Sequence, residues 1–128
     1  MKKVMIDANI YSLAMKGEPE VVDVLQRIEQ IGISVVSIGE LFSGFRAGGR
    51  EKRNREELEI FLDSPRVFVL SIEVETADFY AAVLNQLKSA GTPVPTNDIW
   101  IAAAAFQHGY KLFSKDKHFR FIHGLVQI

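Results

Sequence analysis

The residues Val4-Met5-Ile6-Asp7-Ala8-Asn9 impose the strongest constraint on how this chain folds. A short apolar run ends abruptly in a carboxylate, and a segment with helical character follows it. This pattern is typical of a buried parallel strand that carries an acid at the carboxyl edge of a sheet. The stretch therefore favours an α/β fold in which Asp7 lies at a strand-to-helix junction.

The rest of the chain continues this alternation of short apolar runs and helical segments. We expect further strands at 33–36, 67–70, 111–113 and 125–128. The helical segments are expected at 10–15, from Pro19 to Gly32, from Leu41 to Gly48, at 50–63, between Leu70 and Gly91 with one face formed by Ala77, Tyr80, Ala81, Leu84 and Leu87, and at 99–106, where the helix is apolar on every side. Such alternation predicts a mainly parallel sheet covered by helices on both faces.

Composition narrows the classes of protein. The chain has 128 residues, which suits one domain. The absence of cysteine excludes zinc–thiolate sites, disulfides and cysteine nucleophiles. The formal net charge of −1 means that any nucleic-acid binding must depend on local basic patches. No segment is long enough to cross a bilayer, and polar residues interrupt the N-terminal apolar run too early for a signal peptide, so we expect a cytoplasmic protein.

Four acids occupy junctions of the expected fold: Asp7, Glu40, Asp98 and Asp116. Because the carboxyl ends of parallel strands meet at one edge of a sheet, we expect these side chains to converge. Two carboxylates about 4 Å apart repel by roughly 4 kcal/mol at an effective dielectric constant of about 20, so a cluster of four needs protons or cations. Oxygen ligands select hard cations such as Mg²⁺ or Mn²⁺, which commonly serve phosphoryl chemistry.

Each acid also has a purely structural interpretation. Asp7 can cap the following helix, and Glu40 with Ser37 forms a capping-box pattern. Asp98 can complement a helix dipole, and Asp116 lies in a stretch typical of a turn. Taken one at a time, these interpretations are favoured, and only the joint pattern predicts a site.

Four motifs of the chain resemble those of PIN domains, most closely the short VapC-type toxins of toxin–antitoxin pairs. They are Asp7-Ala8-Asn9, Ser37-Ile38-Gly39-Glu40, Thr96-Asn97-Asp98 with the following alanines, and Ser114-Lys115-Asp116-Lys117-His118-Phe119. The resemblance covers the chain as a single PIN-like nuclease domain, residues 1–128. It implies a three-layer α/β/α sandwich, Mg²⁺- or Mn²⁺-dependent cleavage of RNA by a metal-activated water, a homodimer and a cognate antitoxin.

The resemblance assigns the catalytic and metal-binding roles to Asp7, Glu40, Asp98 and Asp116, with Glu40 acting through a water or a second ion. Whether one or two ions act stays open. Ser114 matches a hydroxyl residue that would support Asp116 or bind phosphate, and Asn9 matches a polar residue near the metal. Ala8 departs from the pattern, since many relatives have Thr or Ser there, but it removes no expected ligand.

Two basic clusters are candidate RNA-binding surfaces: Arg46, Arg50, Lys52 and Arg53 in one, and Lys115 with Lys117 in the other. A solvated helix face is the alternative for the first cluster. We interpret His118 as structural or as flanking the RNA, because the family motif does not need it.

Two other functions remain open at this stage. One is a metal-dependent phosphatase with an aspartyl nucleophile, although such enzymes usually have a second acid two residues later, where this chain has Asn9. The other is a catalytically weak PIN-like module that binds RNA or protein.

Overall fold

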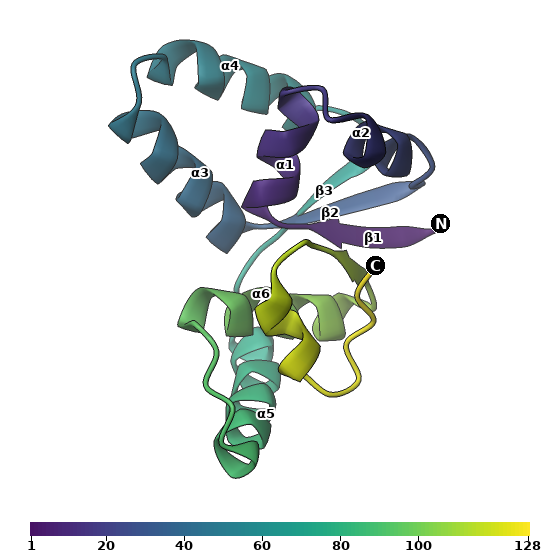
Figure 1. Ribbon diagram of the computed structural model, residues 1–128, viewed down its shortest axis with the longest axis vertical. Coiled ribbons are helices and arrows are strands. Elements are labelled where there is room, and N and C mark those ends of the chain that lie inside the picture. The colour runs from purple at the N-terminus through teal and green to yellow at the C-terminus, as the bar shows by residue number, and fades with distance from the viewer.

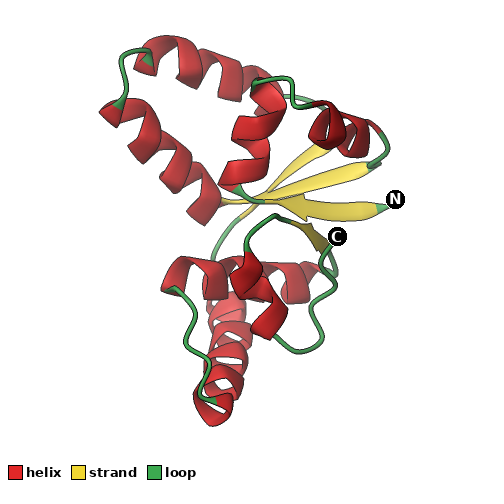
Figure 2. Cartoon of the chain, in the orientation of Figure 1, coloured by secondary structure: helices red, strands yellow, loops and turns green.

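The computed structural model describes residues 1–128 and has a single four-stranded sheet at its centre (Figure 2). The strands are β1 (Lys3–Ile6), β2 (Gln30–Ser34), β3 (Val67–Leu70) and β4 (Lys111–Phe113). All three pairings are parallel, and the spatial order is β3-β2-β1-β4. The predicted parallel sheet is therefore confirmed, and the strands expected at 67–70 and 111–113 have the predicted bounds.

Helices cover both faces of this sheet (Figure 1). One layer contains α1 (Ala8–Met15), α2 (Pro19–Gln26), α3 (Val35–Ala47) and α4 (Glu51–Leu62); the other contains α5 (Val74–Ala90), α6 (Thr96–His108) and the 3₁₀ helix η1 (Lys117–Phe121). Side chains alternate along β1, so that Val4 and Ile6 pack in the first layer and Met5 in the second. The result is the predicted three-layer α/β/α sandwich. None of the helices combines the length and apolar character needed to cross a membrane.

The second strand begins earlier than predicted. It covers Gln30–Ser34, whereas the sequence favoured 33–36, and α2 ends at Gln26 instead of reaching Gly32. The hydroxyl of Ser34 accepts a hydrogen bond of 3.1 Å from the backbone nitrogen of Val36, which starts α3 at once. A serine cap thus overrides the strand preference of the two valines, and the predicted cap at Ser37 is wrong.

Gly32 lies in this strand because its neighbours leave no room for a side chain. A Cβ atom at this position would lie 2.8 Å from Cε2 of Tyr110 and 3.2 Å from Cδ1 of Leu70. The sheet is therefore packed closely against the segment that follows α6. A glycine that the sequence suggested as a helix end is in fact a close contact within the core.

Two further expectations are corrected. In α5 the alanines Ala77 and Ala81 are exposed, because Thr76 faces inward and its hydroxyl donates to Gln107. Residues 125–128 form no strand, although Leu112 makes an isolated parallel bridge to Gln127. The three-residue β4 offers the chain terminus too few partners for a longer ladder.

We predict that Gly32→Ala lowers the free energy of unfolding by about 1–3 kcal/mol, because the new methyl group overpacks the core beside Tyr110. Urea unfolding followed by circular dichroism measures this change. Gly39→Ala is the matched control, since a Cβ atom at Gly39 meets nothing within 4 Å. Equal stability of the Gly32→Ala variant and the unchanged protein would contradict the proposed contact.

Candidate active site

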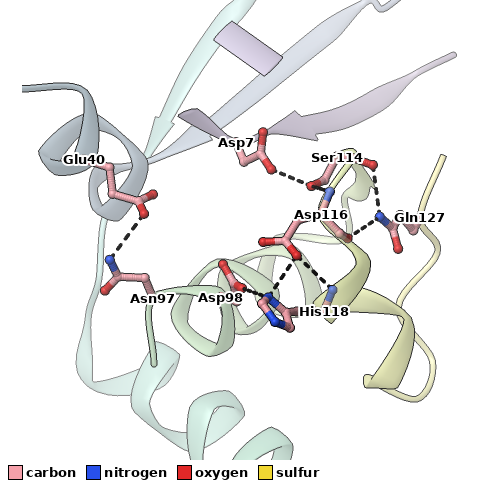
Figure 3. A network of polar contacts seen from close by, with 8 residues as sticks. All are labelled: Asp7, Glu40, Asn97, Asp98, Ser114, Asp116, His118 and Gln127. Carbon is pink, nitrogen blue, oxygen red and sulfur yellow. Dashed lines mark hydrogen bonds and ion pairs between the residues drawn. The ribbon is translucent and has the colours of Figure 1, made fainter. Parts of the chain in front are cut away.

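One pocket of about 400 Å³ collects the four acids at the carboxyl edge of the sheet. Asp7 follows β1, Asp116 follows β4, and Asp98 lies in the first turn of α6. Glu40 reaches the pocket from α3. The lining residues are Asp7, Ala8, Asn9, Glu40, Asp98, Ile101, Lys115 and Asp116. The expected convergence of the acids is thus observed, and Figure 3 shows their arrangement.

Asp7 is held by two hydrogen bonds and is only 7% exposed. One carboxylate oxygen caps α1 by accepting from the backbone nitrogen of Ile10 at 2.9 Å. The other accepts from the hydroxyl of Ser114 (Figure 3). Burial raises the pKa of Asp7, and the nearby charge of Asp116 adds to this effect. Asp7 is therefore both the helix cap and a fixed wall of the pocket.

Ser114 connects Asp7 to the turn that carries Asp116. Its hydroxyl donates to Asp7 and accepts from the backbone nitrogen of Asp116 at 3.0 Å. The side-chain amide of Gln127 donates to the carbonyl oxygens of Ser114 and Asp116, each at 3.0 Å. The position of the fourth acid is therefore fixed by a serine next to it and by a residue near the end of the chain.

Asp98 and Asp116 line the pocket, and the side chain of His118 lies beside both of them. The Nδ1 atom of His118 lies 3.0 Å from a carboxylate oxygen of Asp116 and 3.4 Å from one of Asp98. Burial raises the pKa of Asp98 from 3.8 to about 6, and the negative charge of Asp116 contributes to the increase. The pocket thus contains acids that are not fully neutralised by the protein itself.

Glu40 and Asn9 lie at the outer side of the pocket. Both are exposed, and the only hydrogen bond to the Glu40 carboxylate is a long one of 3.4 Å from the side-chain amide of Asn97. Because α3 starts at Val35, Glu40 lies in its second turn rather than at the strand end. The structure therefore separates three inner acids from one outer acid across the same pocket.

The donor set of this pocket fits a divalent cation. One atom each from Asp98, Asp116 and His118 can be chosen so that all three lie within 4.8 Å of one another. Asp7 and Glu40 add carboxylate oxygens to the pocket, and Mg²⁺ and Mn²⁺ prefer such oxygen ligands. The raised pKa of Asp98 has its cause in burial and like charge, both of which a bound cation would offset.

The two basic clusters are placed differently. Lys115 lies on the rim of the acidic pocket, and exposed Lys117 follows Asp116 without lining it. Arg50 and Arg53 line a second pocket of about 420 Å³ between α1, α3 and α4. Arg46 and Lys52 are exposed and line neither pocket, and Arg46 lies 3.6 Å from Glu51.

A third pocket joins the acidic pocket to the second pocket. It shares Ala8, Asn9 and Glu40 with the acidic pocket, and Ser12 and Phe45 with the second one. These three pockets form a groove along α1 and α3, which we call the α1–α3 groove. It leads from the acids to Arg50.

Three residues of the site could not be assigned a role from the sequence. Asn97 lies within one of the four motifs, which indicate no function for it, and His118 was interpreted as structural or flanking. Gln127 carried no signal, since only the folded chain brings it to the turn before η1. A histidine two residues after an acid of the cluster was the one available indication that His118 belongs to the site.

Comparison with known proteins supports the resemblance inferred from the motifs. A family model described as PIN domain matches residues 4–124. Ribonuclease VapC4 of Mycobacterium tuberculosis is 35% identical over 89 residues, which are 69% of this chain and 68% of that protein. VapC ribonuclease Y4jK of Sinorhizobium fredii is 30% identical over 122 residues, with 88% of this chain and 86% of that protein covered. The DNA-bound VapBC structure from Salmonella typhimurium matches with a TM-score of 0.87 and 26% identity, over 100% of this chain and 98% of that chain.

The raised pKa of Asp98 predicts how the stability of the metal-free protein depends on pH. Between about pH 4 and 6 the folded state binds more protons than the unfolded state, so stability falls as the pH rises. In EDTA, we expect the melting temperature to be higher at pH 5 than at pH 7, and Asp98→Asn to reduce this difference. Asp78→Asn, which removes an exposed carboxylate from α5, is the control. If Asp98→Asn and Asp78→Asn leave the same pH dependence, the burial of Asp98 has no energetic consequence.

Proposed function

Because the chain belongs to the PIN domain family, we propose that it is a metal-dependent endoribonuclease and the toxin of a type II toxin–antitoxin pair. The observation that carries the proposal is the acidic pocket, in which Asp7, Glu40, Asp98 and Asp116 meet from four separate elements. Relatives at 30–35% identity are named as ribonucleases, which supports a nuclease with RNA as its substrate.

Asp7, Asp98 and Asp116 would hold the cation, Mg²⁺ or Mn²⁺, with Glu40 contributing through a water or a second ion. When bound, such a cation polarises a phosphodiester and lowers the pKa of a coordinated water. The buried hydrogen bonds of Asp7 and Ser114 fix the inner acids before the substrate arrives. Glu40 keeps freedom to adjust, because only one long hydrogen bond holds its carboxylate.

The α1–α3 groove is the proposed path of the RNA strand away from the cleavage site. Arg53 is paired with Glu57 at 3.1 Å, and Arg55 stacks on Phe42, whereas Arg50 has neither an ion pair nor an aromatic partner. An unpaired guanidinium in a groove that begins at a metal pocket suits a phosphate of the same strand. Lys115 and Asn9 would contact phosphate nearer the site.

We also infer the partners of the protein from its relatives. The matched structure from Salmonella typhimurium is a VapBC complex bound to DNA, and further solved structures with this fold are toxin–antitoxin complexes. As part of the proposal, this chain forms a homodimer in the cytoplasm. It also has a cognate antitoxin that covers the acidic pocket. Residues 1–128 would act as one nuclease domain.

We predict that the purified protein cleaves structured RNA in the presence of Mg²⁺ or Mn²⁺ and that EDTA stops the cleavage. Asp7→Ala and Asp98→Asn should each lower the rate by more than about 100-fold, which exceeds the usual effect of losing an outer-shell partner of a metal. Product formation on a labelled RNA, measured by gel electrophoresis, tests this expectation.

The control for this experiment is Asp78→Asn, which removes an acid outside the pocket and should retain full activity. Circular dichroism of each variant shows whether it is folded. Cleavage that persists in both pocket variants would mean that a contaminating nuclease or another site is responsible.

A second experiment addresses the groove. In an Asp98→Asn background, Arg50→Ala combined with Arg53→Ala should weaken RNA binding and reduce the dependence of log K on log salt by about 0.7 for each phosphate that the protein then leaves unneutralised. Fluorescence anisotropy over a salt series measures this slope. Arg27→Ala, at an exposed arginine paired with Asp23 on α2, is expected to leave the slope unchanged. An unaltered slope in the double variant would mean that these arginines do not contact RNA and only form a solvated helix face.

A further inference from the structure

We propose that His118 is a direct ligand of the divalent cation and that its nitrogen gives this pocket a preference for Mn²⁺ over Mg²⁺. The proposal rests on the metal dependence proposed above and goes beyond the four acids, none of which distinguishes the two cations. It concerns a side chain that the sequence motif alone leaves without a chemical role.

The spacing of the side-chain atoms supports ligation. The imidazole Nδ1 is 3.0 Å from Oδ1 of Asp116 and 3.4 Å from Oδ2 of Asp98. Ligands that surround a cation at bond lengths of about 2.1 Å, at right angles to each other, lie about 3 Å apart. The imidazole nitrogen is therefore spaced from each carboxylate like a neighbouring ligand of one cation, and Figure 3 shows the imidazole directed at both carboxylates.

The backbone holds His118 in this position from two sides. Its own nitrogen donates to Asp116 at 2.9 Å, which caps η1. The next residue, Phe119, is 1% exposed and anchors the same turn in the core. The side chain of His118 has only two torsions, so the imidazole has a small set of rotamers, one of which faces both carboxylates. Its place beside the acids is thus set by the fold of the turn.

The chemistry of the donor explains the expected preference. Mg²⁺ takes oxygen ligands almost exclusively and keeps several waters. An imidazole nitrogen binds first-row transition-metal cations more strongly than it binds Mg²⁺, and Mn²⁺ belongs to this series as its weakest member. Replacing one oxygen or water by Nδ1 therefore favours Mn²⁺ in a pocket whose other donors suit both cations.

A second arrangement of the same residues makes the opposite prediction. If the Nδ1–H group of His118 only donates hydrogen bonds to Asp98 and Asp116, it competes with a cation for their carboxylate oxygens. Its removal would then increase the affinity for both Mn²⁺ and Mg²⁺. The sign of the change in affinity distinguishes a metal ligand from a competing hydrogen-bond donor, and no activity measurement is needed.

The test is calorimetric titration of the full chain with MnCl₂ and with MgCl₂ at about pH 8. For His118→Ala we expect the Mn²⁺ affinity to fall at least about tenfold, the lower end of what losing an outer-shell partner costs, while the Mg²⁺ affinity changes little. His123→Ala, at an exposed histidine outside the acidic pocket, is the matched control and should bind both cations normally. Thermal melting without metal shows that each variant folds.

Pulsed electron paramagnetic resonance of the Mn²⁺ complex gives an independent readout. We expect a nitrogen hyperfine coupling in the unchanged protein and in His123→Ala, and its loss in His118→Ala and in the polar variant His118→Gln. Absence of the coupling in the unchanged protein, an unchanged Mn²⁺ affinity in His118→Ala, or a rise in both affinities would each overturn the proposal. Binding of Mn²⁺ that Asp98→Asn abolishes but His118→Ala does not would overturn it while leaving the proposed nuclease function intact.

Discussion

The parallel pairing of β1 with β4 is the interaction on which the rest of the molecule depends. It places strands from the two ends of the chain side by side, with Ile6 opposite Phe113. The next residue of each strand is a site residue, so that Asp7 and Ser114 meet across 107 positions of sequence. Helices cover both faces of the sheet at these strands, and β1 is paired along both of its edges, with β2 and with β4. The sheet is therefore the rigid support that keeps like charges close together.

Much of the fold could be predicted because its strands are short apolar runs with clear ends. Val67–Leu70 and Lys111–Phe113 have the predicted bounds, and the alanine-rich helix α6 is buried on nearly every side. The predicted bounds of the second strand were wrong because local sequence preferences do not reveal two features that determine where this strand lies. One is the contact of Gly32 with Tyr110, which lies 78 positions away in the chain. The other is the cap at Ser34, which ends the strand before the valines.

The site shows the same division between local and tertiary information. Asp7, Asp98 and Asp116 were identifiable because each lies where an element begins or ends. The separation of Glu40 from the inner acids could not be predicted from the sequence, because it depends on where α3 begins. Asn97, His118 and Gln127 were missed since their roles exist only between elements, and a hydrogen bond such as that from Gln127 to the carbonyl of Ser114 has no signature in the sequence.

The burial of Asp98 has a consequence for the stability of the folded protein. Active sites commonly hold groups that lower stability, so their removal can make a protein more robust. An asparagine in place of Asp98 keeps the shape of the side chain while it removes a charge that burial disfavours, so the same contacts of the first turn of α6 would be kept with less electrostatic repulsion.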